Sequence, residues 1–201
     1  MDFFIHIQKT GGTSLREAVK GLKDIKVLKH GYMYEVSSYE KKKNPWHVNS
    51  MNIQDYRKDP FTRILTIIRN PFDLLVSYYK HSNFNSPGWG FCNKTHKIES
   101  WDDFLEKYMD PNFDWHLKAM QKSLYSFAYD KKWNFIPDEY FKLEEVGKLN
   151  DYLKLKGGKR LGIFNKTEGK EDYKAYYTSE TVDKLNSIWE KDLKQFNYKF
   201  E

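Results

Sequence analysis

Short apolar runs alternate with segments of helical periodicity along the chain. DFFIHIQ at 2–8 and ILTIIR at 64–69 are continuous apolar runs that predict buried strands. IKVLKH at 25–30 and a stretch within 133–144 predict two more. Because strands alternate with helices, the pattern predicts an α/β fold, a three-layer sandwich with a central parallel sheet.

Amphipathic segments follow or separate these strands. LREAVKGL at 15–22 has helical spacing, and Ser14 with Glu17 fits a capping box at its start. The apolar stripe from Val182 to Phe196 predicts one C-terminal helix that packs in the core. Further helices are expected at 71–81, at 100–109 after a Ser100 cap, at 145–156 before Gly157, and briefly near 52–57.

Length and composition predict a single domain over residues 1–201. The chain has 201 residues, 17% of them aromatic, and one cysteine, Cys92, which leaves no internal disulfide. It contains no apolar run of about 18 residues and no N-terminal signal peptide. We therefore expect a soluble cytoplasmic protein with no membrane span.

The charge balance favours an anionic ligand. Lys and Arg total 34 and Asp and Glu total 28, a formal net charge of +6. Most of these cations are lysines, whereas arginine is the residue that binds phosphate with two parallel hydrogen bonds. The positions of the few arginines therefore indicate a binding site better than the total charge does. We expect no nucleic-acid partner.

A Gly-rich turn, QKTGGTS, joins the first predicted strand to the first predicted helix. Backbone N–H groups at such a turn favour phosphate or sulfate, and Gly11 and Gly12 let an anion approach closely. Thr13 and Ser14 add hydroxyl donors, and Lys9 adds a cation. The alternative is a plain helix-entry turn with Lys9 in solvent.

The turn does not match the nucleotide-binding pattern GxxxxGK[ST]. Here the lysine precedes the glycines, and the strand ILTIIR ends in Arg69 where Mg-dependent enzymes often carry an Asp. Ligands bind at the carboxyl ends of strands in open α/β sheets, so Arg69 and the following Ser77 could clasp a phosphate. The alternative is that Arg69 pairs with Asp73.

Together, the two motifs resemble the sulfotransferases that use 3′-phosphoadenosine 5′-phosphosulfate (PAPS). HIQKTGGTS is similar to their 5′-phosphosulfate-binding loop, and IIRNPFDLLVSYY to their 3′-phosphate-binding segment. The first motif is closest to the carbohydrate branch, including heparan sulfate O-sulfotransferases. Leu74 departs from the pattern, which often has Arg there. FIPDEYFKLEEV and the C-terminal segment from Asn165 resemble the family more weakly.

The resemblance implies sulfuryl transfer from PAPS to an acceptor hydroxyl, with a carbohydrate as the expected acceptor, at a P-loop-like turn. Lys9 would neutralise the bridging oxygen and the departing 5′-phosphate, so no metal is expected. Arg69 and Ser77 would hold the 3′-phosphate, and Lys166 with Thr167 would close over the cofactor. The residues expected to bind PAPS are Lys9, Thr10, Gly11, Gly12, Thr13, Ser14, Arg69, Ser77, Lys166 and Thr167.

The reaction also needs a base for the acceptor hydroxyl. His47 ranks first, because a histidine ahead of the central strand is associated with this role in the family. His30, at the end of the second predicted strand, and His116 are the alternatives. His6 lies in the first predicted strand, and we expect it to be structural.

Two other function classes remain open from the sequence. One is a P-loop-like small-molecule kinase, which the lysine placement disfavours. The other is a non-catalytic anion- or glycan-binding module, which Lys9, Arg69 and Ser77 argue against. Golgi members of the family carry a membrane anchor before the first strand. This chain begins at that strand, so we expect a bacterial enzyme or one in the cytoplasm of a virus-infected cell.

Overall fold

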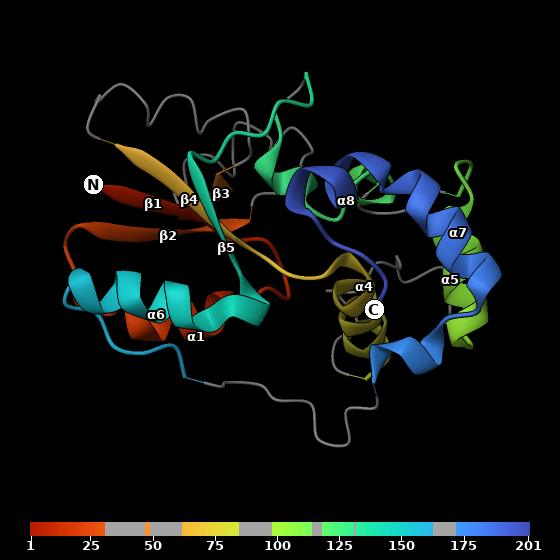
Figure 1. Ribbon diagram of the computed structural model, residues 1–201, viewed down its shortest axis with the longest axis horizontal. Helices are drawn as coiled ribbons and strands as arrows, with labels where there is room; N and C mark the ends of the chain where they lie inside the picture. The colour runs from red at the N-terminus through yellow and green to blue at the C-terminus, as the bar shows by residue number, and fades with distance from the viewer. Residues whose placement is uncertain (31–46, 49–61, 85–97, 114–117, 131, 163–171) are drawn as a thin grey trace. The chain divides into compact units, whose positions relative to one another are not determined.

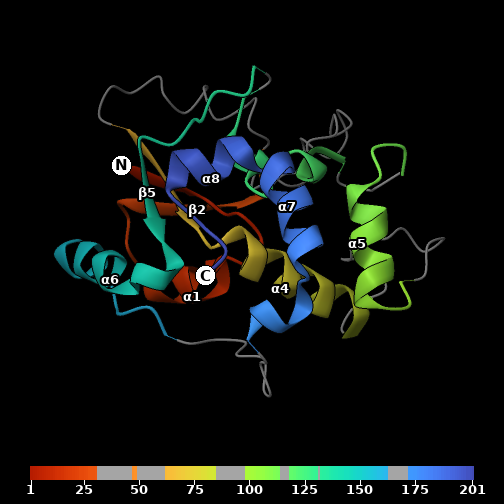
Figure 2. The same cartoon turned by 45° about the vertical axis from the view of Figure 1, so that its right-hand side comes forward.

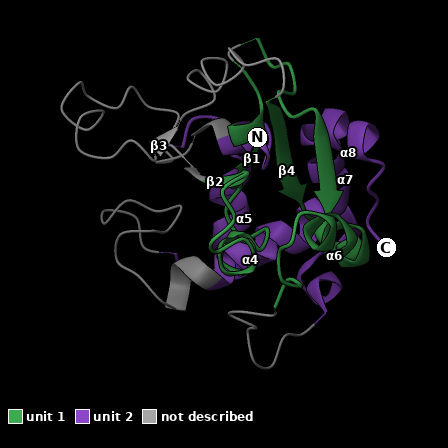
Figure 3. Ribbon diagram, turned by 90° about the vertical axis from the view of Figure 1, so that its left-hand side faces the viewer, with its two compact units in different colours: residues 1–69, 127–167 green, residues 70–126, 168–201 purple. Residues whose placement is uncertain are grey.

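The computed structural model describes residues 1–30, 47–48, 62–84, 98–113, 118–130, 132–162 and 172–201. The chain forms two compact units, which Figure 3 colours separately. Unit 1 comprises residues 1–69 and 127–167, and unit 2 comprises residues 70–126 and 168–201. The single domain expected over residues 1–201 stays a prediction.

A parallel sheet forms the centre of unit 1, with strand order β3-β2-β1-β4-β5 (Figure 1). Its strands are β1 (Asp2–Ile5), β2 (Ile25–His30), β3 (His47–Val48), β4 (Arg63–Ile68) and β5 (Glu139–Lys142). The register pairs Ile5 of β1 with Leu28 of β2 and with Thr66 of β4. The predicted α/β fold with a central parallel sheet is confirmed, and β3 is a strand that the polar pattern did not indicate.

One face of this sheet packs against α1 (Gly12–Ala18) and α6 (Val146–Leu155). Phe4 and Leu65 of neighbouring strands meet Leu15 of α1 and Leu149 of α6 in one buried cluster. The residues that alternate onto the opposite face are buried as well: Phe3, Ile5, Ile64, Thr66 and Ile68. Strands buried on both faces explain the continuous apolar runs in β1 and β4.

The strand order fixes where a ligand would meet the sheet. The chain adds β2 and β3 on one side of β1 and then places β4 on the other side, so the direction reverses between β1 and β4. In open parallel sheets, ligands bind outside the carboxyl ends of the strands at such a reversal. The QKTGGTS turn follows β1 and Arg69 follows β4, so both motifs lie at this edge.

Unit 2 is built from helices (Figure 2). Its elements are α4 (Pro71–Phe84), α5 (Trp101–Met109), η1 (Lys118–Gln121), η4 (Tyr173–Tyr176), α7 (Ser179–Ile188) and α8 (Glu190–Phe196). Two short 3-10 turns complete the fold, η2 (Ser126–Ala128) at the return to unit 1 and η3 (Leu143–Glu145) before α6. Aromatic side chains fill the core of unit 2, where the buried Trp189 Nε1 donates to Tyr108 Oη at 3.0 Å.

The C-terminal apolar stripe forms two helices, so the prediction of one helix is wrong. The helices α7 and α8 meet at Trp189, whose φ of −100° and ψ of 14° depart from helical values. Leu185, Trp189 and Phe196 are buried, which confirms that the stripe packs in the core. The break leaves the stripe in phase because Leu193 N still donates to Trp189 O.

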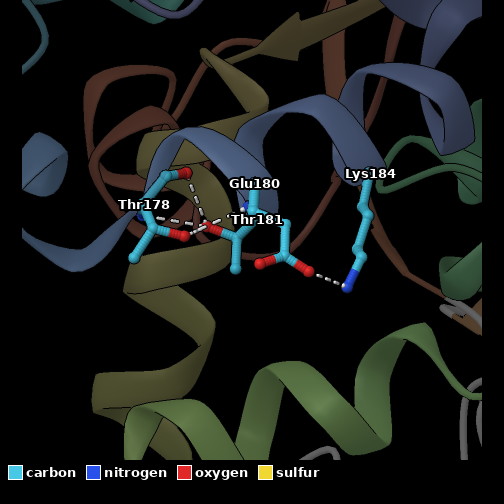
Figure 4. Close-up of polar contacts among 4 residues, drawn as sticks. All are labelled: Thr178, Glu180, Thr181 and Lys184. Carbon is cyan, nitrogen blue, oxygen red and sulfur yellow. Dashed lines mark hydrogen bonds and ion pairs between the residues drawn. The ribbon is translucent and has the colours of Figure 1, made fainter.

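Side-chain caps begin α4, α5 and α7 of unit 2, and at α4 Asn70 Oδ1 accepts from Phe72 N at 3.0 Å. Ser100 Oγ accepts from Asp103 N at 3.1 Å, as predicted for α5. At α7, Thr181 N donates to Thr178 Oγ1 at 3.2 Å, and Thr178 N donates to Thr181 Oγ1 at 3.0 Å (Figure 4). These reciprocal bonds form a capping box that satisfies two N–H groups at the helix start.

The start of α1 differs from the sequence prediction. The helix begins at Gly12, with Gly11 as its N-cap, so the expected capping box of Ser14 and Glu17 is wrong. Ser14 lies inside the first turn and is buried. The short helix expected near 52–57 lies outside the described residues.

Candidate functional site

The turn between β1 and α1 is held in an unusual backbone conformation. Lys9 has a φ of 61° and Gly11 a φ of 89°, both in the left-handed region. Glycine adopts this region without cost, whereas a lysine there is strained by about 1 kcal/mol or more. Such strain persists only where surrounding contacts hold it in place.

Two hydrogen bonds within unit 1 hold the turn. Thr10 Oγ1 donates to Ile7 O at 2.8 Å, and Thr10 is buried. Arg69 Nη1, from the end of β4, donates to Lys9 O at 3.1 Å. The Thr10 hydroxyl therefore donates its proton within the turn. The predicted contact between Thr10 and the cofactor could then be made only by the backbone N–H of Thr10.

Gly12 leaves room for the close approach of His6. A Cβ built at Gly12 would lie 1.9 Å from His6 Cδ2 and 2.0 Å from His6 Nε2. A side chain at Gly12 would displace the imidazole, which packs directly on the backbone at the start of α1. His6 follows β1 and is half-buried.

The first turn of α1 presents donors that no side chain caps. Gly11 brings no side chain to the N-cap position, and the first intrahelical bond runs from Leu15 N to Gly11 O at 2.9 Å. In this geometry the N–H groups of Gly12, Thr13 and Ser14 have no acceptor within the helix. Thr13 is exposed, whereas Ser14 is buried.

Positive charge is concentrated at this turn. Burial lowers the pKa of Lys9, and the nearby charge of Arg69 lowers it further. In the part of the chain that the structure describes, no carboxylate pairs with the Lys9 ammonium. A half-buried cation beside another cation is unfavourable unless an anion neutralises both, so the turn has the electrostatics of an anion site.

The second motif is divided between the two units. Arg69 ends the unit 1 segment and is half-buried, and Ser77 lies on α4 of unit 2, also half-buried. The joint phosphate contact of Arg69 and Ser77 stays a prediction, as does the alternative pairing of Arg69 with Asp73. Leu74, which departs from the family pattern, is fully buried in the core of unit 2.

The two first-ranked base candidates lie on neighbouring strands. The parallel register pairs Lys29 of β2 with His47 of β3, and His30 with Val48. The backbones of His30 and His47 are therefore adjacent at the carboxyl end of β2, next to the strand that leads into the Gly-rich turn. The third candidate, His116, lies outside the described residues.

Other predicted contacts also fall outside the described residues. Lys166 and Thr167, expected to close over the cofactor, belong to the range 163–171. Their proposed role stays a prediction.

The sequence did not predict the contacts of Arg16 with His6 and Thr13 at the turn. Arg16 Nη1 lies 3.4 Å from His6 Nδ1, and Arg16 Nη2 donates to Thr13 Oγ1 at 3.2 Å. The available signal was spacing, because residues three and four positions apart share one face of a helix. Arg16 therefore lies on the same face of α1 as Thr13 and Gly12.

A separate pocket of about 770 Å³ lies between β5 and α6. Its charged lining includes Arg63 with Glu139 and Lys148 with Glu145, and each pair forms a salt bridge. These groups largely neutralise one another. The Gly-rich turn, where no carboxylate of the described residues pairs with Lys9, is the better candidate for an anionic ligand.

Comparisons with known proteins bear on the family and the fold of the chain. A family model described as "Sulfotransferase domain" matches residues 6–135, more than half of the chain. The crystal structure of mouse sulfotransferase SULT7A1 complexed with PAP matches with a TM-score of 0.57 and 14% identity, covering 97% of this chain and 84% of that one. This likeness concerns the fold.

A sulfotransferase from Alicyclobacillus acidocaldarius matches with a TM-score of 0.41 and 15% identity, over 98% of each chain. No match was found among curated proteins. Within the described ranges, no helix is both long and apolar enough to cross a bilayer.

Proposed function

The chain belongs to the sulfotransferase domain family, and we propose that it moves a sulfuryl group from PAPS to the hydroxyl of an acceptor. The observation that carries this proposal is the pairing of Lys9 with Arg69 at the carboxyl edge between β1 and β4. Burial and the nearby charge of Arg69 both disfavour the protonated Lys9 ammonium, and a phosphate-bearing donor would stabilise it. The mouse sulfotransferase with the similar fold was solved as a complex with PAP, which supports the choice of donor.

The residues of the turn fit the phosphosulfate end of the donor. When bound, PAPS supplies a sulfuryl group whose bond to the bridging oxygen of the 5′-phosphate breaks as a bond to the acceptor oxygen forms. Lys9 would neutralise charge on that bridging oxygen. The backbone N–H groups of Gly11, Gly12 and Thr13 would hold the 5′-phosphate, with hydroxyl donation from Thr13.

Residues outside the turn would contact the 3′-phosphate and cover the donor. Arg69 and Ser77 would bind the 3′-phosphate, as the family pattern implies. The hydrogen bond from Arg69 Nη1 to Lys9 O adds a second role, because it ties the strand-end arginine to the backbone of the turn. Lys166 and Thr167 would cover the bound donor.

A histidine would take the proton of the acceptor hydroxyl. His47 is the first candidate and His30 the second, and the backbone register of β2 and β3 supports considering them together. His116 remains the third. Replacing each with alanine, and following the pH dependence of transfer, would identify the one whose loss removes a histidine-like ionisation.

We propose a carbohydrate as the acceptor, because the motif HIQKTGGTS is most similar to that of the carbohydrate sulfotransferases. The test is a screen of glycans and small alcohols with PAPS that carries labelled sulfate. Labelled sulfate on a glycan is the expected result, and labelled product only on small alcohols would contradict the acceptor class. Transfer of a labelled γ-phosphate from Mg–ATP, with none from PAPS, would support a kinase instead.

A further inference from the structure

Arg16 bridges two residues at the start of α1. Its Nη1 lies 3.4 Å from His6 Nδ1, and its Nη2 donates to Thr13 Oγ1 at 3.2 Å. Arginine has only donors, so Nδ1 of His6 accepts this hydrogen and the imidazole proton sits on Nε2. The planar guanidinium is therefore held between the imidazole and the Thr13 hydroxyl.

The charge of Arg16 is not neutralised by its neighbours. Within the described ranges, no carboxylate forms an ion pair with Arg16, which is half-buried. The same holds for Lys9 on the other side of Gly11 and Gly12. Two such cations flanking one turn give the anion site more positive charge than Lys9 supplies alone.

The bridge also sets the direction of a donor. The Thr13 hydroxyl carries one proton and accepts from Arg16. Its own proton must therefore point away from the guanidinium, and Thr13 is exposed at the first turn of α1. A hydroxyl oriented in this way can donate to an anion beside the turn.

His6 limits where the guanidinium can lie. The imidazole packs so closely on Gly12 that no Cβ fits there. Because the ring is fixed against the helix backbone, its Nδ1 offers Arg16 an acceptor at a defined place. The side chain of Arg16, which has many rotamers in solution, is thereby oriented before a ligand binds.

Resting on the proposed function, we propose that Arg16 is a positioning residue for the donor: held by His6, it orients the Thr13 hydroxyl toward the 5′-phosphate of the nucleotide. The role requires the forked geometry of arginine. Lysine keeps the charge but carries it on one nitrogen, which cannot span both partners in the same way. Arg16 makes no contribution to binding of the 3′-phosphate in this arrangement.

Calorimetric titration with two nucleotides tests this role. Adenosine 3′,5′-bisphosphate (PAP) has the 5′-phosphate, and adenosine 3′-phosphate lacks it. We expect Arg16→Ala and Arg16→Lys each to weaken PAP about tenfold or more, the scale of a lost charge-assisted network. Both variants should bind adenosine 3′-phosphate as the wild type does.

Controls separate this role from general charge and from folding. Lys20→Ala removes an exposed cation just beyond α1 and should bind PAP as the wild type does. Thr13→Val should lose affinity only for PAP, and Thr13→Ser should retain it. The Thr13 variants test the hydroxyl that Arg16 orients, and Arg16→Lys keeps the role of Arg16 testable if Arg16→Ala does not fold.

Three results would overturn the inference. Wild-type affinity for PAP in Arg16→Lys would show that charge alone suffices, and wild-type affinity in Arg16→Ala would show no role. Equal losses for both nucleotides would indicate general damage to the site. If the wild type binds neither nucleotide, the proposed function itself fails, and this inference fails with it.

Discussion

Lys9 combines two unfavourable features in one residue. Its backbone lies in the left-handed region, and its ammonium is half-buried beside Arg69. Neither feature stabilises the folded chain, and both place a cation where an anion can reach it. Functional sites commonly hold strain of this kind, because the rest of the fold supplies the stability.

The backbone strain predicts an unusual order of stability among variants. We expect Lys9→Gly to be more stable than Lys9→Ala by about 1 kcal/mol, because glycine adopts a positive φ without a Cβ clash. Urea unfolding measures the difference. Glu17, exposed on α1, provides the control, since Glu17→Gly should there be less stable than Glu17→Ala by about 1 kcal/mol. The same order at both positions would contradict the account.

The lowered pKa of Lys9 predicts a pH dependence of stability. The unfolded chain holds this proton more tightly than the folded chain, so protonated Lys9 lowers the free energy of unfolding. The cost is fully present below the folded-state pKa and is lost as the pH rises from there toward the ordinary value of 10.5.

The wild type should therefore gain stability relative to Lys9→Met between about pH 7 and about pH 10. The measurement is the difference between the unfolding free energies of the two proteins across this range. Contributions from other lysines and tyrosines cancel in that difference. A difference that does not change with pH would mean that the Lys9 pKa is not lowered.

Among the helices and strands, the sequence predicted features that depend on neighbouring residues, such as apolar runs and side-chain caps. It did not predict features that depend on packing between distant residues. The β2 prediction matches the observed strand, and the Ser100 cap predicted for α5 is present. The predicted start of α1 is wrong because the N-cap, Gly11, has no side chain that marks it in the sequence. Ser14 is a residue type that often caps helices, so the pattern favoured it instead. The break at Trp189 was missed because the apolar stripe continues in phase across it.

The same distinction applies to the site. Lys9, Gly11 and Gly12 are contiguous, so a local motif predicted their turn. The hydrogen bond from Arg69 to Lys9 joins residues 60 positions apart and follows only from strand order. The contact between His6 and Arg16 depends on how the end of β1 packs on α1, which periodicity does not encode.

The α7 cap allows a prediction at this scale. Thr178→Ala removes the hydroxyl that accepts from Thr181 N, and we expect a loss of about 1 kcal/mol in unfolding free energy. Thr178→Ser keeps an acceptor at the same place and should retain most of the stability. Equal losses in both variants would show that the methyl group, and not the cap, matters.

For the whole molecule, the topology explains where the chemistry is placed. The reversal of strand order between β1 and β4 puts one cation-bearing segment after each of these strands. The hydrogen bond from Arg69 Nη1 to Lys9 O joins these two segments. Family membership then gives the anion its proposed identity as a phosphosulfate donor.

In the proposed reaction, Lys9 stabilises charge on the bridging oxygen of PAPS while the sulfuryl group passes to the acceptor hydroxyl. The most direct measurement is single-turnover transfer of labelled sulfate from PAPS to a mixture of hydroxyl acceptors, comparing wild type with Lys9→Ala. The wild type should form labelled product, and Lys9→Ala should be slower by about a hundredfold or more, the scale of a lost charge-stabilising group. Near wild-type transfer by Lys9→Ala, or no labelled product from a wild type that binds PAPS, would contradict this role for Lys9.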